Sequence, residues 1–235
     1  SMSGIRGLAA CALGSLGLLY APGASANLTL DFGGITENDE NNTGTGETQL
    51  QVDILDGGGG FRAVDYTISF LVKNLGPAQS TITDIFFMDQ QGLLESIIGI
   101  DNSDPGVDYF HPSSLPNLPG GENFGFFATP GFSAQPSDPR LDNGVDPGES
   151  VTIIFSFAHY YYYDEEFPEE NGTTFEDIIA AINDGSLQIG LRVEGFENGG
   201  AESFLSIRPI PLPAPVFAGM AGLGLLGVRR TRRSV

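Results

Sequence analysis

Apolar side chains alternate with polar ones in several windows of this chain, and this period of two constrains the fold more than any other feature. Successive side chains of a β-strand point to opposite faces, so an alternating strand buries one face against a core. The strictest windows contain Leu50, Val52 and Ile54; Tyr66, Ile68, Phe70 and Val72; Val151, Ile153, Phe155 and Phe157; and Leu187, Ile189, Leu191 and Val193. Residues 28–32, 82–88, 93–100 and 202–207 are shorter candidates. The chain is therefore expected to form a series of short, half-buried strands.

Turn-forming residues separate these windows. Segments 57–60, 117–121 and 143–148 are rich in Gly, Pro and Asn. Many short strands divided in this way are typical of antiparallel sheets, and not of folds in which strands alternate with helices. We therefore predict an all-β domain over residues 27–208, an antiparallel β-sandwich of the immunoglobulin-like or jelly-roll-like kind.

One segment replaces the alternation with a helical pattern. Thr173 and Glu176 match a capping box, and Gly185 is suited to end a helix. The apolar residues between them have the i, i+3, i+4, i+7 spacing of one helix face: Phe175, Ile178, Ile179 and Ile182. We predict one short structural helix that packs on the edge of the sandwich or closes one end of it.

The N-terminal 26 residues have the pattern of a secretory signal peptide. They contain one charged residue, Arg6, then an apolar stretch over 8–20, and then Ala24 and Ala26 at the two small-residue positions of a cleavage site. A lipoprotein-type sequence ending at Cys11 is the alternative, but it leaves almost no apolar segment before the cysteine. We expect an apolar helix here, and a mature chain that begins at Asn27.

The C-terminal segment, residues 209–235, carries three signals in a fixed order. A proline-rich stretch is followed by an apolar, glycine-rich run over 216–228 and then by Arg229, Arg230, Arg232 and Arg233. We expect this run to form a C-terminal apolar helix, and it is short for a membrane-spanning helix, which needs about 20 apolar residues. By the positive-inside rule, the arginines would hold the extreme C-terminus in the cytoplasm and leave the preceding domain outside. A plain membrane anchor and a frayed hydrophobic tail are the simpler alternatives.

This tail resembles the PEP-CTERM sorting signals of Gram-negative bacteria, in the variant that reads Val-Pro-Leu-Pro-Ala. The matching residues are Pro211, Leu212, Pro213 and Ala214, and Ile210 replaces the first Val. The resemblance implies that an exosortase, a membrane cysteine transpeptidase, recognises and cuts the tail. The body would then be released, or attached to the cell surface or to exopolysaccharide. The resemblance thus implies export, with transient anchoring in the inner membrane, and an exosortase as partner.

The body between these segments is strongly acidic. Residues 27–208 contain all 30 acidic residues of the chain, so five basic residues leave a net charge of about −25. Such a charge repels nucleic acid and anionic lipid, and we expect neither as a partner; membrane contact is expected only through the tail. Cys11 is the single cysteine, so the mature body has no disulfide.

Two acidic loops are candidate calcium sites, because loops rich in carboxylate and carbonyl oxygens can supply the six to eight ligands that Ca²⁺ prefers. The candidate ligands are Asp101, Asp104 and Asp108 in one window and Asp142, Asp146 and Glu149 in the other. Neither window has the EF-hand spacing. The segment 146–149 is equally well explained as a β-turn, and solvated surface charge is the simplest explanation of both windows. No other cofactor is expected.

The sequence contains no recognisable catalytic constellation. His111 and His159 are the only histidines, and neither lies in a nucleophile or metal motif, so we expect both to be loop or surface residues. An acid-pair glycoside hydrolase is the alternative, since two carboxylates at a suitable separation could occur among so many acids.

Four consecutive tyrosines, Tyr160, Tyr161, Tyr162 and Tyr163, precede an acidic turn. Exposed tyrosines beside carboxylates can stack on sugar rings and bind their hydroxyls, which makes a carbohydrate-binding module the second hypothesis. The alternative is a strand whose aromatic face covers the sandwich edge.

The body also resembles domains that often precede such sorting tails. The resemblance is carried by segments 74–77, 85–87, 117–121, 145–150 and 175–204. Such domains mostly have no assigned activity, so this likeness implies a location more than a function. Our first hypothesis is therefore an exported surface or matrix structural protein without catalytic activity.

Overall fold

The computed structural model describes residues 28–57, 67–114, 116–161 and 170–207. The predicted signal peptide, the predicted sorting tail with its arginines, the predicted terminal helices, and Tyr162 and Tyr163 all lie outside the described residues. No helix within the described ranges is long and apolar enough to cross a membrane.

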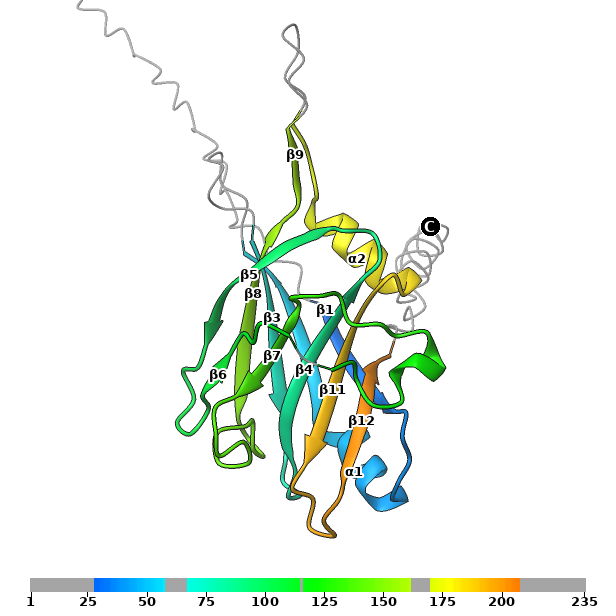
Figure 1. Ribbon diagram of the computed structural model, residues 1–235, viewed down its shortest axis with the longest axis vertical. Helices are drawn as coiled ribbons and strands as arrows, with labels where there is room; N and C mark the ends of the chain where they lie inside the picture. The colour runs from blue at the N-terminus through cyan, green and yellow to red at the C-terminus, as the bar shows by residue number, and fades with distance from the viewer. Residues whose placement is uncertain (1–27, 58–66, 115, 162–169, 208–235) are drawn as a thin grey trace, which may run out of the picture.

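Ten of the twelve described strands form one antiparallel sheet in the order β5-β8-β3-β2-β1-β12-β11-β4-β7-β6, and β9 and β10 pair with each other (Figure 1). The strands are β1 (Leu28–Gly34), β2 (Leu50–Asp56), β3 (Thr67–Asn74), β4 (Thr81–Asp89), β5 (Leu94–Asp101), β6 (Tyr109–Phe110), β7 (Ser133–Pro136), β8 (Ser150–Phe157), β9 (His159–Tyr161), β10 (Glu170–Gly172), β11 (Leu187–Glu194) and β12 (Ala201–Ser206). The helices are α1 (Glu40–Gln49), the 3₁₀ turn η1 (Gly121–Phe124) and α2 (Phe175–Asp184).

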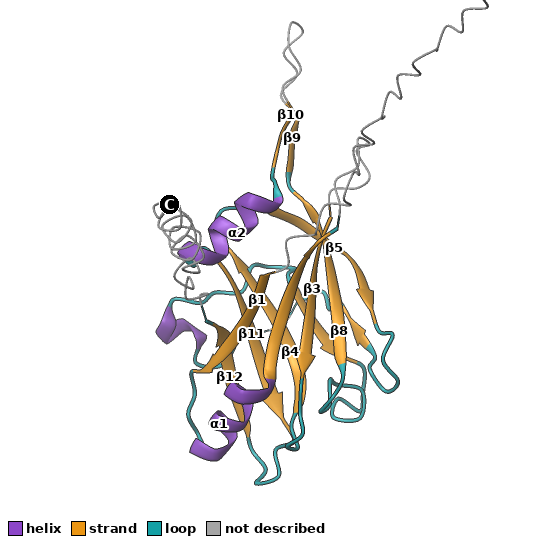
Figure 2. Cartoon of the chain, turned by 180° about the vertical axis from the view of Figure 1, so that it is seen from behind, coloured by secondary structure: helices purple, strands orange, loops and turns teal. Residues whose placement is uncertain are grey.

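The sheet turns over on itself at β1. The first residues of β1, 28–31, pair with β2, whereas 32–34 pair with β12. The half that contains β5, β8, β3 and β2 therefore faces the half that contains β12, β11, β4 and β7 (Figure 2). Phe87 of β4 packs between Phe70 and Phe155 of the opposite half, with ring centroids 5.0 and 4.8 Å away. One apolar core thus joins the two halves.

The predicted all-β antiparallel class is confirmed, and the alternating windows bury every second side chain in β2, β3 and β8. The strand β4 differs because all nine of its residues are buried. Its inner residues Ile85 and Phe87 join the main core, whereas Phe86 and Met88 lie in a second, smaller cluster on the outer face. The loop between β6 and β7 covers that outer cluster.

The prediction of a single helix within the body is wrong, because α1 also forms. Its sequence is polar throughout and has no apolar stripe, so no periodic signal identifies it. The Asp39 side chain caps its N-terminus by accepting hydrogen bonds from the N–H groups of Asn41 and Asn42. Gly46 lies against the ring of Phe204, where a β-carbon would come within 2.1 Å of the ring. Tertiary contact with the core therefore stabilises a helix that propensity alone does not favour.

The predicted helix is confirmed as α2, and its apolar stripe enters the main core. Its capping box lies one residue later than predicted. Thr174 is the N-cap residue, and its partner is Asp177, not Glu176. Aspartate can serve because its carboxylate still reaches the Thr174 N–H, at 2.9 Å. Gly185 ends the helix in the left-handed region, at φ 84°, as predicted.

Candidate functional site

The structure brings the two predicted calcium windows to the same end of the body. The Asp104 carboxylate accepts hydrogen bonds from the backbone N–H and the hydroxyl of Ser150, at 2.7 and 2.9 Å. The Asp108 N–H donates to the Asn143 carbonyl at 3.0 Å. These contacts link the loop after β5 to the long loop before β8, so residues far apart in sequence become neighbours.

Several of the predicted ligands act as hydrogen-bond partners within these loops. Asp146 accepts a hydrogen bond from the Thr81 hydroxyl, and its N–H donates to Glu149 at 2.9 Å. The Glu149 N–H donates back to the Asp146 carbonyl at 2.9 Å, which closes the β-turn considered above. Asp101 is exposed at the end of β5, and the Asp142 N–H donates to Pro139. Among the described residues, no three acidic, histidine or cysteine side chains are grouped to hold a metal ion, and calcium binding stays a prediction.

The structure describes one of the two histidine side chains. His111 is exposed in the loop after β6, as predicted, and its Nδ1 lies 2.9 Å from the Ser133 carbonyl oxygen. The backbone of His159 begins β9. The partner of the His111 ring nitrogen is therefore a backbone carbonyl, and the absence of catalysis stays a prediction.

The tyrosine segment begins a two-stranded ribbon. Tyr160 and Tyr161 lie in β9, in register with Asn171 and Glu170 of β10. The ribbon continues the direction of β8 and projects beyond the end of the body that carries α2 (Figures 1 and 2). The backbone of β9 therefore pairs within the ribbon and is not part of the ten-stranded sheet.

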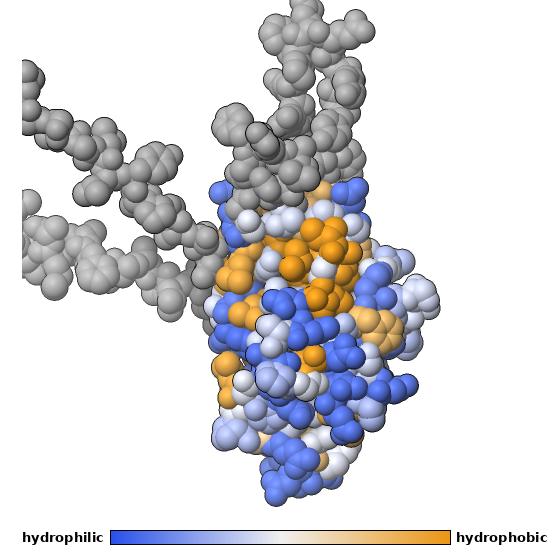
Figure 3. Space-filling model, turned by 90° about the vertical axis from the view of Figure 1, so that its left-hand side faces the viewer, coloured by the Kyte–Doolittle hydropathy of each residue, from blue (hydrophilic) through white to orange (hydrophobic). Residues whose placement is uncertain are grey.

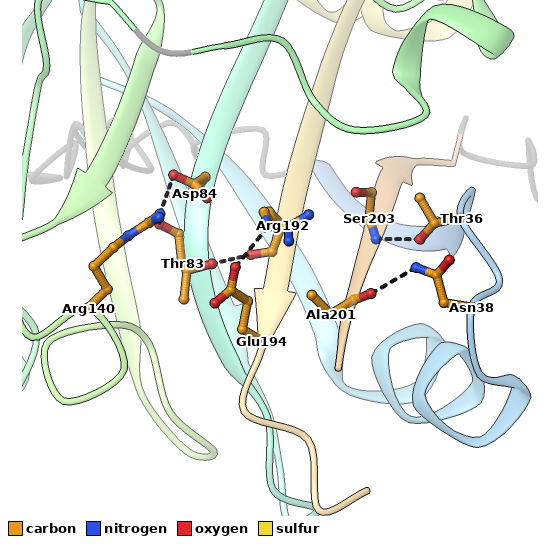
Figure 4. Close-up of polar contacts among 9 residues, drawn as sticks. All are labelled: Thr36, Asn38, Thr83, Asp84, Arg140, Arg192, Glu194, Ala201 and Ser203. Carbon is orange, nitrogen blue, oxygen red and sulfur yellow. Dashed lines mark hydrogen bonds and ion pairs between the residues drawn. The ribbon is translucent and has the colours of Figure 1, made fainter. Parts of the chain in front are cut away.

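Four charged side chains gather on the outer face of the second half of the sheet (Figure 4). The Arg140 guanidinium, from the long loop before β8, pairs with the Asp84 carboxylate of β4 and donates to the Thr83 carbonyl at 2.8 Å. On the adjacent strand β11, Arg192 pairs with Glu194 at 2.8 Å. Burial raises the pKa of the Asp84 carboxyl, and the hydrogen bond and charge of Arg140 only partly offset that rise. The cluster therefore fastens the long loop to β4.

A buried carboxylate organises the segment that leads into α1. Glu202 of β12 is only 1 % exposed, and it accepts hydrogen bonds from the Thr36 hydroxyl, the Asn38 N–H at 3.0 Å and the Asp39 N–H at 2.7 Å. The Asn38 amide donates to Ala201, and Thr36 accepts from the Ser203 N–H, at 2.9 Å each (Figure 4). This carboxylate thus has a structural role.

An acidic hollow of about 540 Å³ lies beside α1. Its lining consists of Glu37, Glu40, Thr43, Gly44 and Glu47. The Glu47 carboxylate accepts a hydrogen bond from the Gly34 N–H at 3.1 Å, which holds the helix against the end of β1. The hollow carries concentrated negative charge at the point where β1 ends.

The loop between β6 and β7 presents two exposed phenylalanines. Phe124 is 58 % and Phe127 is 61 % exposed, whereas Phe126 between them is fully buried. Phe126 and Leu118 pack on Gly190 of β11, where a β-carbon would lie 2.7 Å from Leu118. Because Gly190 has no side chain, the loop can approach the sheet closely and anchor on it.

Hydrogen bonds fix the conformation of this loop. The Asn117 amide donates to the Phe126 carbonyl at 3.1 Å and accepts from the Ala128 N–H at 3.0 Å. Gly120 and Gly125 flank η1 with φ of 79° and 74°, in the left-handed region that favours glycine. Phe124 and Phe127 are therefore held on an ordered support, which lowers the entropy cost of binding through them.

A second apolar surface lies on the opposite half of the sheet, along the edge strand β5 (Figure 3). Ile98 is 55 % exposed, and the half-buried Leu93, Ile97 and Ile100 adjoin the core beneath it. The register between β5 and β8 shifts twice, which indicates β-bulges. Bulges bend an edge strand and oppose pairing with another chain, so this edge is protected against simple strand addition.

Comparison with known proteins found no match to this chain among family models, curated proteins or solved structures. The surfaces described above are therefore interpreted from their own geometry.

Sequence reasoning missed the exposed phenylalanines, the Asp84–Arg140 pair and the Glu202 carboxylate. A partial signal for the loop was present, since residues 117–121 stood out as a Gly- and Pro-rich turn. No feature of the neighbouring sequence distinguishes Glu202 from the other acidic residues. Its partners lie more than 160 residues away in the sequence.

Proposed function

We propose that this chain is an exported, non-catalytic structural protein of the cell surface or extracellular matrix, whose tail is processed by an exosortase. One observation carries the proposal. The first and last described strands, β1 and β12, are neighbours in the sheet, and Phe32 pairs with Ser206. The strand β1 begins at Leu28, just after the predicted cleavage site, and β12 ends at Ser206, before the sorting motif.

This arrangement makes both predicted cleavages compatible with the fold. Cutting after Ala26 and within residues 211–214 removes no residue of any described strand or helix. Terminal segments outside hydrogen-bonded elements are where processing is tolerated best. The two facing halves of the sheet also support the sandwich description of the body, immunoglobulin-like or jelly-roll-like in kind.

The acidic surface suits an exported protein of this kind. A net charge of about −25 on the body favours solubility and repels other copies and anionic membranes. A matrix role would place the body among polymers, with exopolysaccharide as the proposed partner.

The test is the intact mass of the protein recovered from a host that encodes an exosortase. We expect a chain that starts at Asn27 and lacks the arginine cluster, and deletion of the exosortase should leave the tail attached. As a matched variant, Pro211→Ala with Pro213→Ala should retain the tail without changing the N-terminus. Secreted material that keeps residues 2–26, or a tail that is lost equally without the exosortase, would contradict the proposal.

Carbohydrate binding is the second candidate, and the ribbon favours it. The strand β9 places Tyr160 and Tyr161 on an element that stands outside the ten-stranded sheet. A glycan array probed with the full chain and with a Tyr160→Ala, Tyr161→Ala variant separates the two functions. Binding that disappears in the variant favours a carbohydrate-binding module, and no binding by either favours the structural role. The acid-pair hydrolase stays a prediction to which no specific pair can be assigned.

A further inference from the structure

An apolar patch adjoins the point where the described chain ends. Three exposed apolar side chains belong to the half of the sheet that contains β12 and to the loop that covers it, and we call them the phenylalanine patch: Phe124, Phe127 and Ile207, the last of which is 48 % exposed. Leu205, two residues before Ile207, lies in the same outer cluster as Phe126. Alternate residues of a strand share a face, so Ile207 continues the outer face beneath the phenylalanine loop. Figures 1 and 2 both place the end of β12 beside η1.

The residue at this exit is held against the sheet. The Ile207 N–H donates to the Asp31 carbonyl at 2.8 Å, and its side chain lies over Gly33. Gly34, the residue after Gly33, adjoins the acidic hollow, where the Glu47 carboxylate accepts a hydrogen bond from the Gly34 N–H. The chain therefore leaves the body beside β1, the strand whose C-terminal end adjoins the acidic hollow.

The segment that follows has the complementary composition. Twenty-eight residues come after Ile207, namely an eight-residue linker, the apolar run 216–228 and the arginine cluster. Eight extended residues span up to about 26 Å, so the run can reach a patch beside the exit. Four arginines match the acids on this side of the body, which include Glu37, Glu40 and Glu47.

We propose that, while the tail is attached and not inserted in a membrane, the apolar run 216–228 docks on the phenylalanine patch. The inference rests on the proposed function only in that the tail stays attached until processing. Tethering raises the local concentration of the run to the millimolar range. A second copy and an anionic membrane are both repelled by the charge of the body, whereas the tail brings opposite charge.

The experiment places a photo-crosslinking p-benzoylphenylalanine at position 124 or 127 of the full chain, at high dilution in buffer, with and without vesicles of zwitterionic lipid. The matched control places it at Ile98, which is equally exposed on the other apolar surface. We expect intramolecular crosslinks to residues 216–228, with a yield at least about tenfold above the control. Replacing Leu223, Leu225 and Leu226 with Ser should remove most of this yield.

Each other outcome overturns the proposal. Crosslinked dimers would assign the patch to a second copy, and lipid adducts would assign it to a membrane. A crosslinking yield equal to that at position 98 would show that the tail does not bind the patch. The assay needs no exosortase. Failure of tail docking is therefore distinguishable from failure of the processing experiment, which measures the mass of exported protein.

Discussion

Replacing Glu202 tests whether one buried carboxylate holds the start of α1 on the sheet. In Glu202→Ala, three hydrogen bonds disappear, from the Thr36 hydroxyl and from the N–H groups of Asn38 and Asp39. Each partly buried donor left without a partner costs about 1–2 kcal/mol. The substitution also removes the cost of burying a carboxylate that pairs with no cation among the described residues, and this offsets part of the loss. We therefore expect a net destabilisation of about 2–3 kcal/mol.

The assay is urea unfolding together with thermal melting. For a domain of this size, 1 kcal/mol corresponds to about 2–4 °C, so Glu202→Ala should lower the Tm by roughly 5–10 °C. Glu202→Gln keeps one acceptor oxygen and should lose less stability than Glu202→Ala. Glu122→Ala, at an exposed glutamate of η1, is the control and should stay within about 0.5 kcal/mol of wild type.

Amide hydrogen exchange locates the effect. The N–H groups of Asn38 and Asp39 should lose protection in Glu202→Ala, while those of β3 and β8 should exchange as in wild type under native conditions. If Glu202→Ala unfolds within about 0.5 kcal/mol of wild type, the carboxylate does not organise this segment and the reasoning is wrong.

Three further predictions concern the core, the pH response and calcium. Ile178→Asp should destabilise the body by several kcal/mol because it buries an unpaired charge, whereas the exposed His111→Ala should leave the thermal melt unchanged. Burial raises the folded-state pKa of Asp84, so its contribution to stability is full below its unfolded pKa and is lost as the pH rises through the folded pKa. Urea melts between pH 4 and 8 should show this fall in stability, and Asp84→Asn should flatten it. Millimolar calcium should raise the Tm more than sodium chloride of equal ionic strength. An unchanged Tm would mean that the loops around Asp104 and Asp146 do not bind calcium.

The sequence predicted those elements whose signal is local and periodic. Alternation identified β2, β3, β8 and β11, because a half-buried strand must present apolar residues at every second position. The apolar stripe identified α2 for the equivalent reason. The helix α1 has no stripe, since its buried residues are polar or glycine and its stability depends on Phe204 and Asp39.

The surfaces that distinguish this molecule were not predictable because each joins distant segments. Phe126 is buried because Gly190, more than 60 residues later, leaves room for it, and this anchoring leaves Phe124 and Phe127 exposed. An exposed phenylalanine cannot be recognised from a sequence in which most of its kind fill the core. The same closure of β1 on β12 brings the chain exit beside that loop. The topology of the sheet therefore connects Ile207, where the described chain ends, to the phenylalanine loop and, through β1, to the acidic hollow.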